Sequence, residues 1–151
     1  MCLDSKLTYE QATASLKRSP TILKVHVLDQ IRAHSSNVAH GVEVPPGARL
    51  LFTNGQTGTR PDGTAPETAA AQTEVAFERV GEVLKAARMS FSDVVRFDVY
   101  FTDRADVPAF VAIRDRIMGA HKPGATLIIV AALARPELKI EIEAVAAKVD
   151  S

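Results

Sequence analysis

The sequence predicts an α+β domain in which two helices cover one face of a mixed sheet. Apolar residues recur at helical spacing over residues 64–88, and they alternate with other residues over residues 94–102 and 139–147. A chain of 151 residues is also long enough to bury a real core within one domain. We therefore expect a folded domain over residues 24–151, preceded by a loosely attached N-terminal extension over residues 1–23.

The first part of the domain is expected to hold short strands. Alternation over residues 22–28 predicts one strand. Two apolar runs follow at residues 40–44 and 49–54, and a Pro-Pro-Gly turn at residues 45–47 separates them. We expect these two runs to pair as a β-hairpin.

A long helix is expected next. Thr64 and Glu67 have the spacing of a capping box, and Pro66 fits the first helical turn. The helix should continue to about Arg88, because its apolar positions repeat every three or four residues. These positions are Ala76, Phe77, Val80, Val83, Leu84 and Ala87.

The second half of the sequence predicts a strand, a helix and two further strands, in that order. Residues 94–102 alternate and form a strand with two different faces, and residues 107–120 form a helix. Residues 126–133 are apolar on both faces, which predicts a central strand covered on each side. In the last strand, residues 139–147, the even-numbered positions are apolar and the odd-numbered ones include two glutamates.

Two helices cannot cover both faces of such a sheet. The face without helices would expose apolar side chains unless another chain covers it. We therefore expect a homo-oligomer.

Composition narrows the class of function. Lys and Arg number 18 and Asp and Glu number 18, so neither nucleic acid nor an anionic membrane is an expected partner. The apolar run at residues 127–134 is too short to span a bilayer. Cys2 is the only cysteine, and the first residues lack an apolar signal core, which predicts a cytoplasmic protein. The four histidines lack metal-ligand spacing, so no metal site is expected.

The sequence carries several separated motifs: Leu-Phe-Thr-Asn-Gly-Gln at residues 51–56, Gln72, the strand at residues 94–102, Pro-Gly-Ala-Thr at residues 123–126, and Ile-Glu-Ile-Glu-Ala-Val-Ala at residues 140–146. Together these motifs resemble the RidA/YjgF family of reactive-intermediate deaminases. They follow one another in order and at family spacing between Val38 and Lys148.

The resemblance implies a chorismate-mutase-like (YjgF-like) fold and a homotrimer with clefts between neighbouring subunits. It also implies hydrolysis of enamines or imines to a keto acid and ammonia, with neither cofactor nor metal. In the family pattern, Glu141 corresponds to the residue that positions water. Asn54, Gly55, Gln56 and Thr126 correspond to residues that bind substrate.

Four positions depart from the family pattern. The arginine that holds the substrate carboxylate is replaced by Ala125, and a serine is replaced by Asn54. An aromatic residue is replaced by Val38, and an asparagine by Val111. Losing a charge-assisted hydrogen bond costs about 1.5–3 kcal/mol, so a substrate other than the simplest imino acids is expected.

Arg114 lies within the apolar arc of the second helix, where a charge must find a partner. In one reading it reaches the edge of the sheet and pairs with a carboxylate. In the other it reaches the cleft, binds substrate and replaces the clamp missing at Ala125. Arg116, on the other side of that helix, is expected in solvent.

We consider three functions. The first is a cofactor-free hydrolase for a small enamine or imine, or a lyase for a related activated carbonyl compound, with Glu141 as acid and base. The second is a ligand-binding or regulatory trimer without chemistry. The third, a ribonuclease, finds no basic patch or aromatic platform in the sequence.

Overall fold

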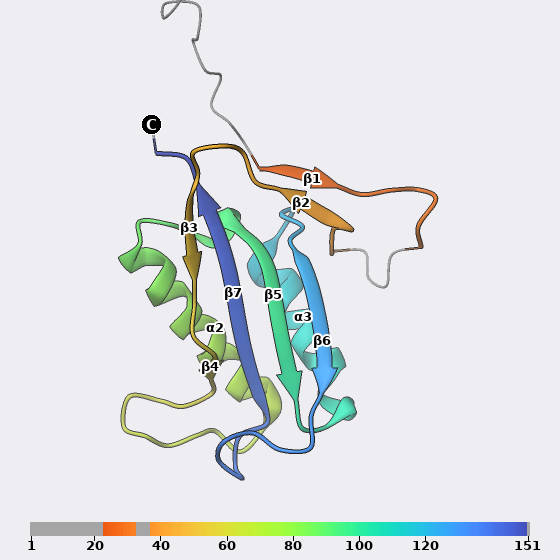
Figure 1. The fold of residues 1–151 in the computed structure, drawn as a ribbon. Helices are drawn as coiled ribbons and strands as arrows, with labels where there is room; N and C mark the ends of the chain where they lie inside the picture. Colours follow the sequence, from red (N-terminus) through yellow and green to blue (C-terminus); the bar gives the residue numbers. More distant parts are fainter. Residues whose placement is uncertain (1–22, 33–36, 151) are drawn as a thin grey trace, which may run out of the picture.

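Strand β7 (Ile140–Lys148) is the central strand of the main sheet in the computed structural model, which describes residues 23–32 and 37–150. It pairs antiparallel with β3 and β4 on one side and with β5 on the other, and β6 adds to β5 in parallel (Figure 1). The bounds of these strands are β3 Arg49–Phe52, β4 Gln56–Thr57, β5 Val94–Phe101 and β6 Gly124–Ile129.

Both helices, α2 (Ala69–Ala86) and α3 (Val107–Met118), lie on the same face of this sheet (Figure 1). Two short 3-10 turns, η1 (Phe91–Asp93) and η2 (Arg104–Asp106), lead into β5 and α3. The predicted α+β architecture, a mixed sheet with two helices on one face, is confirmed.

The core lies between the helices and the sheet. Ile140 and Ile142 of β7 are fully buried there. Aromatic rings fill the centre: Phe77 of α2 stacks with Phe110 of α3 at 5.8 Å between ring centroids and meets Phe97 of β5 edge-on at 5.7 Å. These contacts fix how both helices pack on the sheet.

The other face of the sheet carries no helix, and we call it the open face. Register places on it the side chains of Leu50, Phe52, Arg96, Asp98, Tyr100, Thr126, Ile128, Glu141, Glu143 and Val145. Three large apolar members are exposed: Phe52 at 69%, Leu50 at 53% and Ile128 at 45%.

The predicted hairpin is wrong. Strand β2 (Gly41–Glu43) pairs with β1 (Lys24–His26) as a separate two-stranded sheet, whereas β3 pairs with β7. The turn at residues 45–47 separates them, because neither proline has an N–H to donate to a ladder and Gly47 takes a positive φ of 81°. The first strand is also shorter than the predicted residues 22–28.

The predicted start of the first long helix is wrong. The helix begins at Ala69, and Thr68 is its N-cap, with its side chain accepting a bond from the backbone N–H of Ala71. Thr64 instead donates from its N–H and its hydroxyl to Asp62. That local turn competes with capping, so no capping box forms at Thr64.

The predicted central strand at residues 126–133 is also wrong. β6 ends at Ile129 and lies at the edge of the main sheet, paired in that sheet with β5 alone. A continuous apolar run predicts burial on both sides but does not tell which strands flank it. The second helix ends at Met118, because Gly119 takes a positive φ of 56° directly after it.

The predicted extension at residues 1–23, including Cys2, lies almost wholly outside the described residues. No helix within residues 23–32 and 37–150 is long and apolar enough to cross a membrane.

Candidate active site

Glu141 lies near the start of β7, on the open face. Its register partners are Thr57 of β4 and Tyr100 of β5, so its side chain stands between these two strands. Its neighbours Ile140 and Ile142 point to the opposite face and anchor the strand in the core. This alternation is why the local sequence presents a carboxylate on a firmly held strand.

Gly55 lies directly against the Glu141 carboxylate. A methyl group added at Gly55 would lie 1.7 Å from Glu141 Oε1 and 2.6 Å from its Cδ, far inside contact distance. The lack of a side chain at this position therefore makes room for the carboxylate. The structure thus brings together two of the residues that the family resemblance implied.

Gln56 and Asn54 flank this glycine. Gln56 is 9% exposed, and its Nε2 donates to the Asn54 carbonyl at 3.1 Å. Its Oε1 accepts a hydrogen bond from Arg79 Nε at 3.0 Å. The Gln56 amide is thus bonded within the protein at both ends, while the Asn54 side chain is exposed. Substrate binding by these residues stays a prediction.

The two predicted residues of β6 lie on opposite faces. Ala125 is in register with buried Phe97 and packs against the core under the helices. Thr126 is in register with Asp98 on the open face, and its hydroxyl accepts a bond from Arg96 Nη2 at 2.8 Å. Of this pair, only Thr126 shares a face with Glu141.

Arg114 is not on the open face. It belongs to α3 in the helix layer, is only 1% exposed and lies 5.9 Å from the centroid of the Phe110 ring. Its Nε and Nη2 donate to Asp115 Oδ1 at 2.9 and 2.6 Å. The guanidinium thus has a carboxylate partner on its own helix, and its predicted role as a substrate clamp gains no support from these contacts. Arg116 is exposed and bonded to Glu74.

Three polar residues of β5 belong to this surface and were not among the predicted site residues. Arg96 binds Asp98 through two hydrogen bonds of 2.7 and 2.6 Å, which raises the pKa of the guanidinium. The negative charge of Glu143, followed by burial and by the charges of Asp98 and Glu141, raises the pKa of Tyr100. The alternation of β5 was the signal that could have placed these residues beside Glu141.

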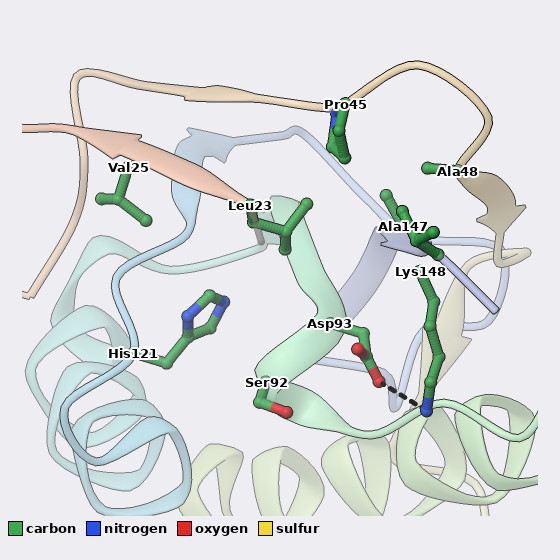
Figure 2. A pocket seen from close by; sticks show the side chains of 10 residues that line it. Leu23, Val25, Pro45, Ala48, Ser92, Asp93, His121, Ala147 and Lys148 are labelled. Carbon is green, nitrogen blue, oxygen red and sulfur yellow. Dashed lines mark ion pairs between the residues drawn. The ribbon is translucent and has the colours of Figure 1, made fainter. Parts of the chain in front are cut away.

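A hollow of about 490 Å³ lies at the other end of β7, beneath the small β1–β2 sheet (Figure 2). Its polar groups already have partners: His121 Nε2 lies 2.6 Å from the Val94 carbonyl, and Lys148 Nζ pairs with Asp93 and donates to the Arg88 carbonyl. None of the predicted site residues lines it. We therefore place the candidate active site at Glu141.

No group of three or more His, Cys, Asp or Glu within the described ranges is arranged to hold a metal ion. Glu141 and its neighbours offer a carboxylate, hydroxyls and backbone groups. Such a set can hold a water molecule and exchange protons with it.

Comparison with known proteins identifies the family. The sequence model of the family described as Endoribonuclease L-PSP matches residues 33–148, most of the chain. The chain belongs to this family, and similar solved structures include proteins described as members of the Rid and YjgF families. The resemblance and the YjgF-like fold inferred from the sequence motifs are thereby confirmed.

Individual relatives agree with this assignment. The Rid family protein YyfB from Yersinia pestis, whose function is described as unknown, has a TM-score of 0.74 at 30% identity, covering 83% of this chain and 98% of that protein. Reactive Intermediate Deaminase A, chloroplastic, from Arabidopsis thaliana is 30% identical over 135 residues, which are 88% of this chain and 71% of the relative. TdcF from Escherichia coli, solved with bound serine, has a TM-score of 0.62 at 26% identity, covering 85% of this chain and 99% of TdcF.

Proposed function

We propose that this protein is a cofactor-free deaminase that hydrolyses a small enamine or imine, with Glu141 as its acid and base. The close approach of the Glu141 carboxylate to Gly55 carries the proposal, since it places a proton acceptor against half-buried backbone, on a strand whose neighbouring residues Ile140 and Ile142 are buried in the core. The deaminase named in Arabidopsis and the serine-bound TdcF support a small nitrogen-containing substrate.

The proposed reaction adds water across the C=N bond. Glu141 accepts a proton from a water molecule while the oxygen of that water bonds to the imine carbon. Glu141 then gives the proton to the imine nitrogen. Glu141 then carries the proton of the new hydroxyl group to the nitrogen in the same way, the C–N bond breaks, ammonia leaves and a carbonyl group remains. Water supplies both the oxygen and the protons, so the balance needs no oxidant or reductant.

We propose that three copies assemble through the open face. Phe52, Leu50 and Ile128 are exposed there, and their burial between subunits would remove apolar surface from water. Each cleft would then lie where the open face of one subunit meets its neighbour. The small-molecule substrate would bind in this cleft.

The specificity of the site is expected to differ from that of a simple imino-acid deaminase. Ala125 cannot hold a carboxylate, and it faces the core rather than Glu141. We therefore expect a substrate that is less anionic, or derived from a ring. Asp98 and Glu143 on the same face also disfavour RNA, whose phosphates they would repel.

The decisive assay uses 2-iminobutyrate, generated in situ from threonine by a dehydratase, and a panel of less anionic imines. The wild type should accelerate hydrolysis of at least one of them above the rate in buffer, with ammonia released. Glu141→Gln should abolish this activity, while Glu143→Gln, two residues along the same strand and face, should retain most of it. Binding of an imine analogue without turnover would instead favour the ligand-binding trimer.

A further inference from the structure

Arg79 of helix α2 fastens the segment that passes beneath Glu141. Its Nε donates to Gln56 Oε1 at 3.0 Å, and its Nη1 donates to the carbonyl of Thr59 at 2.8 Å. One guanidinium therefore holds both β4 and the loop that follows it. Because a guanidinium carries a positive charge, both bonds are charge-assisted.

These bonds determine which way the Gln56 amide points. A guanidinium has only donors, so the atom of Gln56 that faces Arg79 must be the amide oxygen. The amide nitrogen then faces the Asn54 carbonyl, to which it donates at 3.1 Å. A rotated amide would place donor against donor at Arg79 and oxygen against oxygen at Asn54. Arg79 thus stabilises the turn that joins Asn54 to Gln56.

Gly55 is the middle residue of that turn, and the Glu141 carboxylate lies against it. A shift of the turn by less than an ångström would change the space in which the carboxylate stands. We propose that Arg79 is a positioning residue for Glu141, acting through the Gln56 amide and Gly55. The effect on turnover rests on the deaminase function proposed above.

A second residue of α2, Gln72, holds the chain that leads into β7. Gln72 is fully buried, its Nε2 donates to the carbonyls of Pro66 and Glu137, and its Oε1 accepts from the N–H of Lys139. Gln72 and Arg79 are seven residues apart, about two helical turns, and so lie on one side of α2. The helix therefore fixes both the chain entering β7 and the turn beneath Glu141.

Arg79 is exposed, so its removal should leave no cavity in the core. Arg79→Ala is expected to lower kcat about 10- to 100-fold, the usual effect of losing a charge-assisted hydrogen bond, with KM changed less than about threefold. Arg79→Lys, which keeps a donor and the charge, should recover part of kcat. Arg116→Ala, which removes another exposed arginine with a carboxylate partner, should keep wild-type kinetics.

A double-mutant cycle tests the route of the effect. If Arg79 acts through Glu141, Arg79→Ala combined with Glu141→Asp, which keeps a carboxylate and measurable turnover, should lose less than the product of the two single losses. The positioning role would be overturned if the two single losses in kcat simply multiplied in the double variant. It would also be overturned if Arg79→Ala changed only KM.

Amide hydrogen exchange gives a readout that does not depend on activity. Arg79→Ala should speed exchange in residues 55–59 at least about tenfold, while Val99 and Ile142 in the core strands keep their protection. Unchanged exchange in residues 55–59 would overturn the inference even in an active enzyme. If exchange in residues 55–59 is faster in Arg79→Ala but the protein hydrolyses no imine, the result supports the stabilisation of this turn by Arg79. It refutes only the deaminase function.

Discussion

The two faces of the main sheet are built from alternate residues of the same strands, yet they differ in almost every property. On the helix face, Phe97, Val99, Ile140 and Ile142 are completely buried. On the open face, the intervening residues of β5 and β7 are mostly charged or polar, and large apolar side chains at its margins remain exposed. The helix face is therefore covered by the helices of the same chain, whereas the open face is not covered by any helix.

This difference separates stability from chemistry. The helix face is dry and apolar, so it supplies the hydrophobic free energy that holds β7 in place. The open face then presents Glu141 from a strand that is anchored in the core through Ile140 and Ile142. A change on the helix face should alter unfolding at any protein concentration, whereas a change on the open face should alter assembly or catalysis.

The largest effect is expected at Phe77, where the helix face is most tightly packed. Phe77→Ala should lower the free energy of unfolding by about 3–5 kcal/mol, because it removes a ring that contacts Phe91, Phe97 and Phe110. Urea unfolding followed by circular dichroism measures this loss. A loss below about 1 kcal/mol would show that the core is not packed as described.

The next effect belongs to the open face. Gly55→Ala should lower kcat at least about 100-fold, because the new methyl group takes the place of the Glu141 carboxylate. Gly41→Ala is the matched control, since a methyl group there meets nothing within 4 Å. Imine hydrolysis is measured for both variants. Equal rates would break the link between Gly55 and the reaction.

Assembly should respond to the apolar part of the open face. Phe52→Glu places a charge where we propose that subunits meet, so the mass measured by light scattering should fall about threefold at micromolar concentration. Lys85→Glu, on the outer side of α2, should leave the mass unchanged. A wild type that is already monomeric under these conditions would refute the proposed trimer and its clefts.

The helix layer contains the buried charge of Arg114. Removing its carboxylate partner tests how much burial strengthens this pair. Asp115→Ala should cost about 1–3 kcal/mol of stability, because it removes the carboxylate bonded twice to buried Arg114. Glu74→Ala removes the partner of exposed Arg116 and should cost less than about 1 kcal/mol. Similar losses in thermal unfolding of the two variants would contradict the difference in burial.

The smallest effect concerns Tyr100 on the open face. Its pKa is raised, first by the charge of Glu143, so the folded protein holds this proton more tightly than the unfolded chain. The resulting stability is present below about pH 10 and is lost as the pH rises through the folded pKa. Ultraviolet titration should show a lower pKa for Tyr100 in Glu143→Gln, with Tyr100→Phe isolating the signal of the other tyrosine. An unchanged titration would remove Glu143 as the cause.

Strong periodicity made part of the fold predictable. The apolar stripe of α2 and the alternation of β5 and β7 were recognisable because each repeats over two or more turns or pleats. The predicted hairpin was wrong for a physical reason. Strands β2 and β3 are only three and four residues long, and each pairs with another strand, β1 or β7, rather than across the turn that joins them.

The site was predictable only in part. The motifs of the family indicated Glu141 and Gly55, and the structure shows their contact. Arg79 could not be found in this way, because an exposed arginine on a helix has the pattern of a solvated residue until the fold brings Gln56 beneath it. Ala125 and Thr126 are adjacent in the sequence, but only strand register tells which one shares a face with the carboxylate.

The central position of β7 also constrains how the protein is made. Every other described strand precedes it in the chain, and β3, β4 and β5 all pair with it. On the ribosome, the earlier strands emerge without their common neighbour and have to wait for it before the sheet can close. Pairing over such long separations is slow, so the edges of the earlier strands stay unpaired until β7 has been synthesised.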